Sequence, residues 1–482
     1  MTLEPPRAQQ EAWLAALSRF VLDHLEGLEQ ALAAGPIGAA GAAIADEVSR
    51  PIGEAPLPGG IDEIVRLLDR AASASLTAPG PGYLAYIPGG GLFGAALADF
   101  VADALNRYTG LSAPAPALFR LEEDVLSWLC RAFGYGPQAR GLLTPGGSLA
   151  TVSAVVAARH ARFGDGGDFR RATAYTSAQA HHSVGKAIRL AGIPAGNLRF
   201  VEVDERFRLR PEALAAAIDE DLARGQAPFL VIAAAGTTNT GAVDPLGPLA
   251  DLCAARKLWL HVDAAYGGAF VLCQEGKARL HGIERADSLT FDPHKGLFLP
   301  YGTGCLLVRE GEQLRAAHQV SAEYLQDLGD GRAVSWSPAE LGPELSRDFR
   351  GLRLWLPLML HGAGAFRDAL AEKLALAERF VSGLDELIGG GLPLEIVARP
   401  QLSLVAFRLR RGPDEPLPAW NQRNAALLAA INGRQRVHLS STLLPVEDGA
   451  AFTLRVCVLS FRTHERHVER CLEDLAASAI NC

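Results

Sequence analysis

Helix-like stretches alternate with short apolar, strand-like runs between about residues 95 and 310, and this alternation limits the folds that the chain can adopt. Two of the runs are 229–234 and 304–309. Strands that alternate with helices along a chain usually form a mainly parallel sheet with helices on both faces. We therefore predict an α/β fold for this region. Because 482 residues exceed what one apolar core usually serves, we expect two or three domains in all.

The C-terminal part of the chain has a different pattern. Runs 402–408 and 452–458 alternate apolar and polar residues, as antiparallel strands with one polar face do, and they follow a long helix expected at 348–390. These features predict a separate small α+β domain. The predicted divisions are an N-terminal helical segment with a loop (1–94), a large domain (95–360) and a small C-terminal domain (361–482).

The N-terminal segment contains one apolar helix and one long uncharged run. Residues 10–34 have helical periodicity, and the alanine- and glycine-rich stretch 33–43 is expected to be a linker. The uncharged run 71–98 is long enough to span a bilayer, but its prolines and three successive glycines would break a spanning helix. We therefore predict a helix end, a loop and a helix start there, and no membrane segment.

Composition argues against several classes of partner. The formal net charge is −8 and the 46 lysines and arginines are scattered, which argues against binding to nucleic acid or to an anionic membrane. The seven cysteines include no CxxC pair, and their odd number argues against a disulfide framework. The first residues lack the basic segment and apolar stretch of a signal peptide. These observations predict a cytoplasmic protein.

Two strand-like runs lead to residues of opposite charge. Run 258–263 ends at Asp263, and run 288–291 leads to Lys295, 32 residues after Asp263. That separation fits neighbouring strands joined by a crossover. Taken singly, each residue has a simpler explanation, Asp263 as a strand-end cap and Lys295 as a solvated loop lysine.

Taken together, the two residues match the chemistry of pyridoxal phosphate. A lysine amine can form an imine with the cofactor aldehyde, and an aspartate can hold the pyridine nitrogen protonated. Opposite charges about 4 Å apart attract by about 4 kcal/mol at an effective dielectric constant of 20, which equals roughly three pKa units. The pair Asp263 and Lys295 therefore indicates a pyridoxal phosphate site.

A glycine-rich turn supplies a candidate phosphate site. Gly146, Gly147 and Ser148 immediately precede a stretch whose apolar positions recur at helical spacing. Free backbone N–H groups, the positive end of the helix dipole and the Ser148 hydroxyl would suit a cofactor phosphate. The turn has neither the Lys-Ser/Thr of a nucleotide P-loop nor a GxGxxG pattern, and a plain capped turn is the simpler alternative.

At these positions the chain resembles the group II pyridoxal-phosphate decarboxylases, the family of aromatic amino acid, histidine and glutamate decarboxylases. The stretches that carry the resemblance are TPGGSLAT (144–151), AYTSAQAHHSVGKA (174–187), GTTNTGAVDPL (236–246), HVDAAYGG (261–268), ADSLTFDPHKG (286–296) and SRDFRGLRLW (346–355). The resemblance implies a transferase-like architecture of fold type I, in which the large domain binds pyridoxal phosphate.

The resemblance also implies roles for individual residues. Lys295 would form the imine, Asp263 would pair with the pyridine nitrogen, and Ala265 would lie beneath the ring. His181 would stack on the other ring face and orient the substrate carboxylate or relay a proton. The other expected contacts are Gly146, Gly147, Ser148, Thr238, Asp292 and His294 with the cofactor, and Tyr86, Ile87, Pro88 and Gly89 with the substrate. Asp292 stands where several relatives have asparagine.

The predicted reaction is decarboxylation of an L-amino acid to the amine and carbon dioxide. In relatives a loop tyrosine protonates the carbon that carbon dioxide leaves, but the corresponding stretch 327–342 contains no tyrosine. Tyr324, just before that stretch, or His181 would then supply the proton. The alternatives are aldehyde synthesis or transamination at the same site, and a non-catalytic regulator that binds pyridoxal phosphate.

The sequence does not identify the amino acid. Ile87, Phe119 and Arg120 differ from the residues at pocket-like positions of aromatic-specific relatives. Arg455 and Arg462 could pair with a substrate carboxylate, or they could lie on a solvated strand and its edge.

Three further features concern structure and assembly. Arg350 and Arg353 are expected to form structural ion pairs. His464 and His467 have helical i, i+3 spacing, but without a third ligand nearby they predict no metal site. The apolar stripe of the first helix needs a cover, and in relatives it packs on a second subunit, with both subunits completing each active site. We therefore expect a homodimer.

Overall fold

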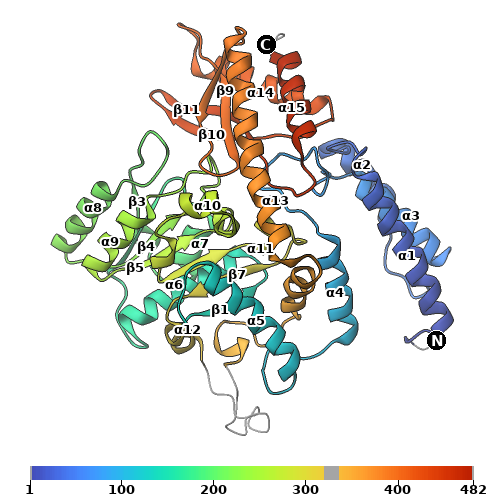
Figure 1. Ribbon diagram of the computed structural model, residues 1–482, viewed down its shortest axis with the longest axis horizontal. Coiled ribbons are helices and arrows are strands. Elements are labelled where there is room, and N and C mark those ends of the chain that lie inside the picture. Colours follow the sequence, from blue (N-terminus) through green and yellow to red (C-terminus); the bar gives the residue numbers. More distant parts are fainter. Residues whose placement is uncertain (1–2, 320–335, 480–482) are drawn as a thin grey trace.

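The computed structural model describes residues 3–319 and 336–479. Its larger sheet, which lies in the body of the molecule (Figure 1), has seven strands in these residues. Their order in the sheet is β1-β7-β6-β5-β4-β2-β3. The strands are β1 (Arg140–Thr144), β2 (Ala172–Ser177), β3 (Leu198–Val201), β4 (Ala227–Ala234), β5 (Trp259–Asp263), β6 (Ser288–Phe291) and β7 (Gly304–Val308). All neighbours from β6 to β3 are parallel, and only β7 runs antiparallel to its two neighbours. The predicted mainly parallel sheet is confirmed.

Helices cover both faces of this sheet. Successive side chains of β4 point to opposite faces. Val231 and Ala233 join an apolar core with α8 (Pro211–Ala223) and α9 (Leu246–Arg256), whereas Leu230 and Ile232 join a second core with α6 (Gly147–Phe163). The remaining helices around the sheet are α5 (Pro116–Ala132), α7 (Ser183–Leu190), α10 (Gln274–Arg279), α11 (Pro293–Gly296) and α12 (Gly311–His318).

The strand pairing gathers several chain segments at one edge of the sheet. Because β4, β5 and β6 are parallel, their carboxyl ends meet there, and Asp263 lies between Ala234 and Thr290. Directly after β6 the chain turns into α11, which carries Lys295. The antiparallel strand β7 places Gly304 opposite Thr144, at the end of β1. The turn that follows β1 therefore lies beside the start of β7.

The C-terminal part forms a separate four-stranded antiparallel sheet (Figure 1). Its order is β10 (Ser440–Val446), β11 (Gly449–Cys457), β9 (Leu404–Leu409) and β8 (Leu394–Ala398). Helix α14 (Leu417–Gly433) packs on this sheet, and α15 (Glu465–Ala479) packs on α14. The predicted antiparallel strands are confirmed. The long helix expected at 348–390 is α13 (Arg350–Gly389), but it is two helices, because Gly362 has φ 70° and ψ 156° and interrupts the helical turn.

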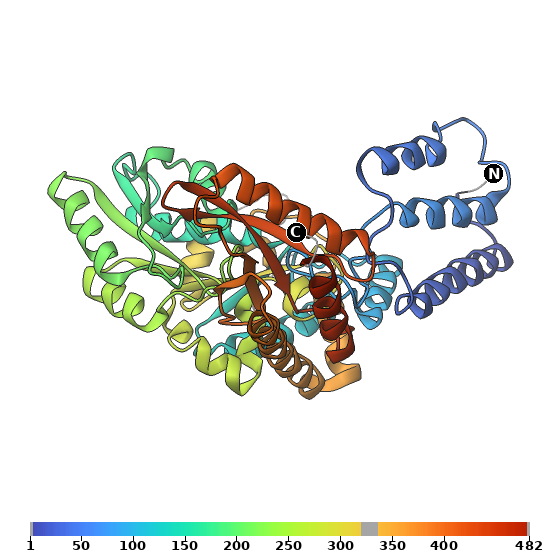
Figure 2. The same cartoon turned by 90° about the horizontal axis from the view of Figure 1, so that it is seen from above.

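Three helices form an arm that extends from the rest of the molecule (Figure 2). They are α1 (Arg7–Gly27), α2 (Gly38–Val48) and α3 (Gly60–Ser73), and α4 (Phe93–Leu105) follows the loop after them. The helix end, loop and helix start predicted within 71–98 are therefore confirmed. None of the helices in residues 3–319 and 336–479 is both long enough and apolar enough to cross a membrane.

Two sequence predictions about the arm are wrong. The first helix was expected to continue to residue 34, but it ends at Gly27. After it the chain turns, Leu28 and Ala33 become buried, and the Ala33 N–H donates to the Gln435 carbonyl at 2.9 Å. The expected linker 33–43 is partly helix α2, since its alanines favour a helix more than its glycines oppose one.

Candidate active site

A pocket of about 500 Å³ lies at the carboxyl edge of the large sheet. It brings together every cofactor residue that the sequence predicted: Gly146, Gly147, Ser148, His181, Thr238, Asp263, Ala265, Asp292, His294 and Lys295. Of the four predicted substrate residues, Tyr86 and Ile87 line the pocket. Pro88 and Gly89 are buried beside it, and a side chain at Gly89 would meet the His294 carbonyl.

Asp263 and Lys295 face the pocket from neighbouring strand ends. One carboxylate oxygen of Asp263 accepts the Ala265 N–H at 3.1 Å. Burial raises the pKa of Asp263, and the positive charge of Lys295 opposes that rise. The Lys295 side chain is only 24% exposed, and its Nζ lies 2.8 Å from Oδ2 of Asp292. The description of Lys295 as a solvated loop lysine is therefore wrong.

The glycine turn forms the start of α6. Gly146 is the N-cap residue, Gly147 is the first helical residue, and no side chain caps the helix. A Cβ on Gly147 would lie 2.9 Å from both carboxylate oxygens of Asp292, and a Cβ on Gly304 would lie 2.4 Å from the Gly146 carbonyl carbon. These glycines keep the helix N-terminus open to the pocket, where backbone N–H groups can bind an anion.

Asp292 lies at this same end of the pocket. Its Oδ1 atom is buried and has no hydrogen-bond partner among the described residues, although Oδ2 pairs with Lys295. A buried polar atom without a partner is costly, which indicates that a further polar group belongs here. The pocket thus combines an amine, a buried carboxyl and an open helix N-terminus, and these residues fit pyridoxal phosphate.

Two histidines line the pocket as neutral rings. His181 Nδ1 lies 2.8 Å from the Ser183 hydroxyl, and its ring lies against that of His182. Burial lowers the pKa of His181 to about 4, and the charges of His182 and Lys295 act in the same direction. His294 donates from Nδ1 to the Thr303 carbonyl at 2.6 Å, and burial lowers its pKa.

The pocket also contains residues that the sequence did not single out: Tyr83, Thr151, Ser183, Ala234, Gly236, Thr237, Tyr266 and Tyr301. Tyr83 stacks on His438, and burial raises the pKa of its hydroxyl. Tyr83 and Thr237 adjoin predicted residues, so proximity along the chain could have identified them. Nothing in the sequence marks Tyr301, because it reaches the pocket from the loop after α11.

The arginines suggested as carboxylate partners bind the backbone instead. Arg455 is 4% exposed and donates to the carbonyls of Thr238 and Asn239. Arg462 donates to the carbonyls of Pro79 and Gly90. The explanation as a solvated strand is also wrong for Arg455, because its guanidinium is buried between β11 and the loop that contains Thr238 and Asn239.

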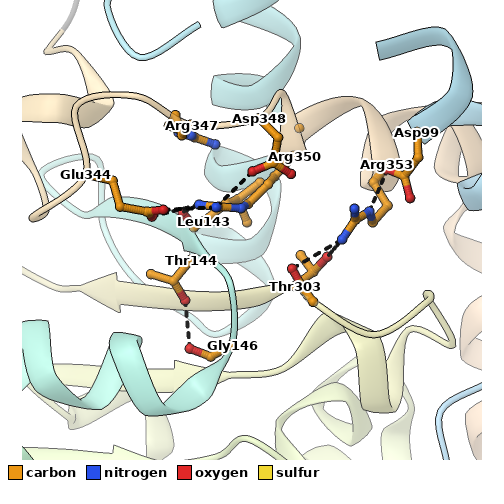
Figure 3. A network of polar contacts seen from close by, with 12 residues as sticks. Asp99, Leu143, Thr144, Gly146, Thr303, Glu344, Arg347, Asp348, Arg350 and Arg353 are labelled. Carbon is orange, nitrogen blue, oxygen red and sulfur yellow. Dashed lines mark hydrogen bonds and ion pairs between the residues drawn. The ribbon is translucent and has the colours of Figure 1, made fainter. Parts of the chain in front are cut away.

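A second arginine network holds the strand ends in place (Figure 3). Arg350 pairs with Glu344 and Asp348 at 2.8 Å each and donates to the carbonyl of Leu143, in the strand that leads to the glycine turn. Arg353 pairs with Asp99 at 2.6 Å and donates to the Thr303 hydroxyl at 2.6 Å. The predicted structural ion pairs are confirmed.

Several other candidates lie away from the pocket. Phe119 and Arg120 lie on α5, next to a different cavity. His464 and His467 bind Glu372 and Glu29 respectively. Tyr324 and most of the stretch 327–342 lie outside the described residues. Trp336, which is described, lies between the guanidinium groups of Arg140 and Arg315, each 5.2 Å from its ring centre.

The chain is similar to known decarboxylases over most of its length. Residues 70–410 match the model of the pyridoxal-dependent decarboxylase conserved domain. The aromatic-L-amino-acid decarboxylase of Bacillus atrophaeus is 35% identical over 418 residues, 86% of this chain and 85% of that protein. Tyrosine decarboxylase 2 of Arabidopsis thaliana is 33% identical over 80% of this chain and 71% of that protein.

Solved structures agree with these sequence matches. A crystal structure of Oryza sativa TDC with PLP and tryptamine superposes with a TM-score of 0.89 and 26% identity, over 100% of this chain and 99% of that chain. Catharanthus roseus tryptophan decarboxylase in complex with L-tryptophan gives a TM-score of 0.87 and 25% identity, with 100% of both chains covered. The chain therefore belongs to the pyridoxal-dependent decarboxylase family, and it is a pyridoxal-phosphate-dependent carboxy-lyase.

Proposed function

We propose that the protein converts an L-amino acid with an uncharged aromatic side chain into the corresponding amine and carbon dioxide. The observation that carries this proposal is the meeting of Lys295, Asp263 and the open N-terminus of α6 in one pocket of about 500 Å³. When bound, pyridoxal phosphate would supply an electron-withdrawing ring that accepts the electrons left behind by carbon dioxide.

Each pocket residue then has a defined task. Lys295 would hold the cofactor covalently and release it to the substrate amine. Asp263 would keep a proton on the ring nitrogen. His181, as a neutral ring, would orient the substrate carboxylate or relay a proton. The residues expected to hold the rest of the cofactor are Gly146, Gly147, Ser148, Thr238, Ala265, Asp292 and His294.

The proposed substrate class follows from the rest of the pocket lining. Among the described lining residues, the charged side chains are Asp263, Asp292 and Lys295, which the cofactor would engage. No arginine lines the pocket there to bind an acidic substrate side chain. Tyr83, Tyr86, Ile87 and Tyr301 offer aromatic and apolar surface instead. The names of the relatives from Bacillus atrophaeus and Arabidopsis thaliana also favour an aromatic amino acid.

A panel of amino acids tests the reaction and the substrate class together. We expect one molecule of carbon dioxide for each molecule of amine, with aromatic amino acids turned over fastest. Carbon dioxide with an aldehyde product would favour the aldehyde-synthase alternative, for which a phenylacetaldehyde synthase of Arabidopsis thaliana, 30% identical over 81% of this chain and 80% of that protein, is a precedent. A keto acid without gas, or a spectral shift without any turnover, would contradict the proposal.

We also propose that the active form is a homodimer. No residue of α1 is buried, and its apolar side chains are 37–53% exposed: Trp13, Leu14, Leu17, Val21 and Leu22. The helix α4 adds a second apolar face with side chains that are 37–57% exposed: Phe93, Leu97, Phe100, Val101 and Leu105. Apolar faces of this extent usually mark an interface between proteins, and a second copy of the chain would cover both.

The domain division and the location remain part of the proposal. A break near residue 360 is supported by Gly362, which interrupts α13, and by a third apolar core, most of which comes from Leu376 onward and includes the C-terminal sheet. That core also includes Leu84, so the segment 1–94 contacts the small domain. A cytoplasmic location is supported by six described cysteines that are all free and buried.

A further inference from the structure

Asp292 occupies an unusual position at the phosphate end of the pocket. Its side chain is 4% exposed and lies against the first residue of α6, where a Cβ on Gly147 would be 2.9 Å from either carboxylate oxygen. Oδ2 pairs with the Lys295 ammonium at 2.8 Å, while the buried Oδ1 has no hydrogen-bond partner in the part of the chain that the structure describes. One oxygen of the carboxyl is therefore directed to the amine, and the other is left for a group that the helix N-terminus also attracts.

The groups around this carboxyl come from several elements. The charged or titratable groups that face it are Lys295 and His294 of α11, Asp263 at the end of β5, His181 ahead of α7 and Cys305 of β7, besides the N-terminus of α6. Lys295 is the one full positive charge among them. Once Lys295 becomes bonded to the cofactor, the Asp292 carboxylate loses this partner.

A charged Asp292 would then repel the cofactor phosphate. Both groups are negative, and both lie at the N-terminus of α6, in a pocket where water screens charges poorly. A protonated carboxyl has the opposite effect, because its O–H can donate a hydrogen bond to a phosphate oxygen. Both carboxyl oxygens of Asp292 lie beside Gly147, and Oδ1 is the one that no described residue engages, so it is free to make such a hydrogen bond.

We propose that Asp292 accepts the proton that the Lys295 ammonium must give up when the cofactor binds, and then donates it in a hydrogen bond to the cofactor phosphate. The transfer converts an ammonium and a carboxylate into an amine and a carboxylic acid. The amine can then attack the cofactor aldehyde, form the C=N bond and release water. This inference rests on the proposed function, since it concerns the same cofactor.

Binding measurements with Asp292→Asn test the proposal without an activity assay. The amide donates to phosphate without needing a proton. We expect the variant to bind pyridoxal phosphate at least tenfold more tightly than the wild type at pH 8.5, equal to about 1.4 kcal/mol. The difference in affinity between the variant and the wild type should become smaller as the pH falls to 6.5. Binding to the wild type takes up one proton more than binding to the variant, so a lower pH favours the wild type.

A comparison with pyridoxal, which lacks the phosphate, isolates the contribution of the proposed hydrogen bond between Asp292 and the phosphate. The substitution also removes the charge partner of Lys295, and this change affects both ligands equally. Both ligands need the neutral amine of Lys295, but only the phosphate would keep the proton on Asp292 after the reaction. We therefore expect the ratio of wild-type to variant dissociation constants to depend on pH for pyridoxal phosphate but not for pyridoxal. Calorimetry in two buffers with different ionisation enthalpies, neither of them a primary amine, counts the protons taken up on binding. We expect the wild type to take up one proton more than the variant with pyridoxal phosphate, and the same number with pyridoxal.

Controls separate the possible failures. Asp287→Asn makes the same change at the other end of β6, where Asp287 accepts the Leu260 N–H and pairs with Arg309, and it should leave both affinities unchanged. Asp292→Ser also removes the charge and repeats the test if the asparagine variant does not fold. A wild type that binds no pyridoxal phosphate would overturn the proposed function. If the ratio of wild-type to variant dissociation constants were the same for pyridoxal phosphate and for pyridoxal at each pH, only the role of Asp292 would be overturned.

Discussion

At the residue scale, the proposed function assigns to Asp263 the control of the electronic state of the bound cofactor. We predict that Asp263→Asn lowers kcat by about 10²–10³-fold, because an amide cannot favour the protonated ring by the roughly three pKa units that a nearby carboxylate supplies. Steady-state kinetics with the preferred amino acid measures the loss. The variant should still bind the cofactor through Lys295.

Borohydride reduction distinguishes the two charged residues. Reduction should attach the cofactor to a peptide that contains Lys295 in the wild type and in Asp263→Asn, and to no peptide in Lys295→Ala. If Asp263→Asn kept wild-type turnover, Asp263 would have no part in holding the ring proton. Labelling of Lys295→Ala would place the imine on another amine.

Single residues also show what the sequence could and could not predict. Asp263, Lys295 and the glycine turn were predictable because each ends or begins an element with a clear pattern. Arg455 was not, because its hydrogen-bond partners Thr238 and Asn239 are more than 200 positions away along the chain. The sequence shows which residue types lie on a strand. It does not show which carbonyl groups accept hydrogen bonds from a buried guanidinium, because that depends on how distant parts of the chain pack together.

At the element scale, the contact between β7 and the glycine turn sets the shape of the phosphate site. We predict that Gly304→Ala weakens pyridoxal phosphate binding at least tenfold, since the new Cβ would lie 2.4–2.7 Å from backbone atoms of Gly146 and Gly147, which must then move. Titration of the cofactor absorbance measures the affinity. Gly185→Ala in α7 is the matched control, because the atom nearest to its Cβ is 4.0 Å away. Equal affinities of the two variants would contradict the prediction.

The pair β5 and β6 contains a histidine that makes stability depend on pH. His261 is fully buried, with Nδ1 2.8 Å from the Ser288 hydroxyl and Nε2 3.2 Å from the Thr290 hydroxyl. Burial lowers its pKa from 6.5 to about 3 in the folded protein. Between these two pH values the unfolded chain binds more protons, so the stabilising contribution is complete above pH 6.5 and is lost as the pH falls.

We predict that His261 accounts for a loss of about 2 kcal/mol in the free energy of unfolding between pH 7.5 and pH 5. Denaturant unfolding of the cofactor-free protein at both pH values measures it. His261→Asn should be less stable at pH 7.5 but should lose about 2 kcal/mol less on acidification. His24→Asn, at an exposed position of α1, should behave as the wild type does. An identical acid loss in all three proteins would show that His261 does not titrate in this way.

Elements differed in how well their limits could be predicted. Strands β4, β7, β9 and β11 were found because apolar runs or alternation mark them directly. The limits expected for α13 were within two residues of the observed ones, but periodicity did not show the end of α1 or the break inside α13. Ala33 pairs with the backbone of Gln435, and Gly362 has φ 70°, a conformation that glycine adopts readily.

At the scale of the whole molecule, the contacts that the arm of α1, α2 and α3 makes with its own described chain do not suffice to stabilise it. It extends from the body in both views (Figures 1 and 2), and α1 packs on α3 without burying any of its own residues. An exposed helix with an apolar stripe gains little from its own contacts. A second subunit would supply the missing contacts and place the arm beside the body of its partner.

We predict that the double substitution Leu14→Asp and Leu17→Asp raises the dimer dissociation constant at least a hundredfold, because two apolar side chains that the second subunit would cover become unpaired charges in the interface. Light scattering after size exclusion should give twice the chain mass for the wild type and the chain mass for this variant. Leu190→Asp with Leu222→Asp is the matched control, since those leucines are 66% and 49% exposed on the body of the molecule. If each active site needs both subunits, turnover should fall with dissociation and return at high protein concentration. A wild-type monomer with full activity would contradict the prediction.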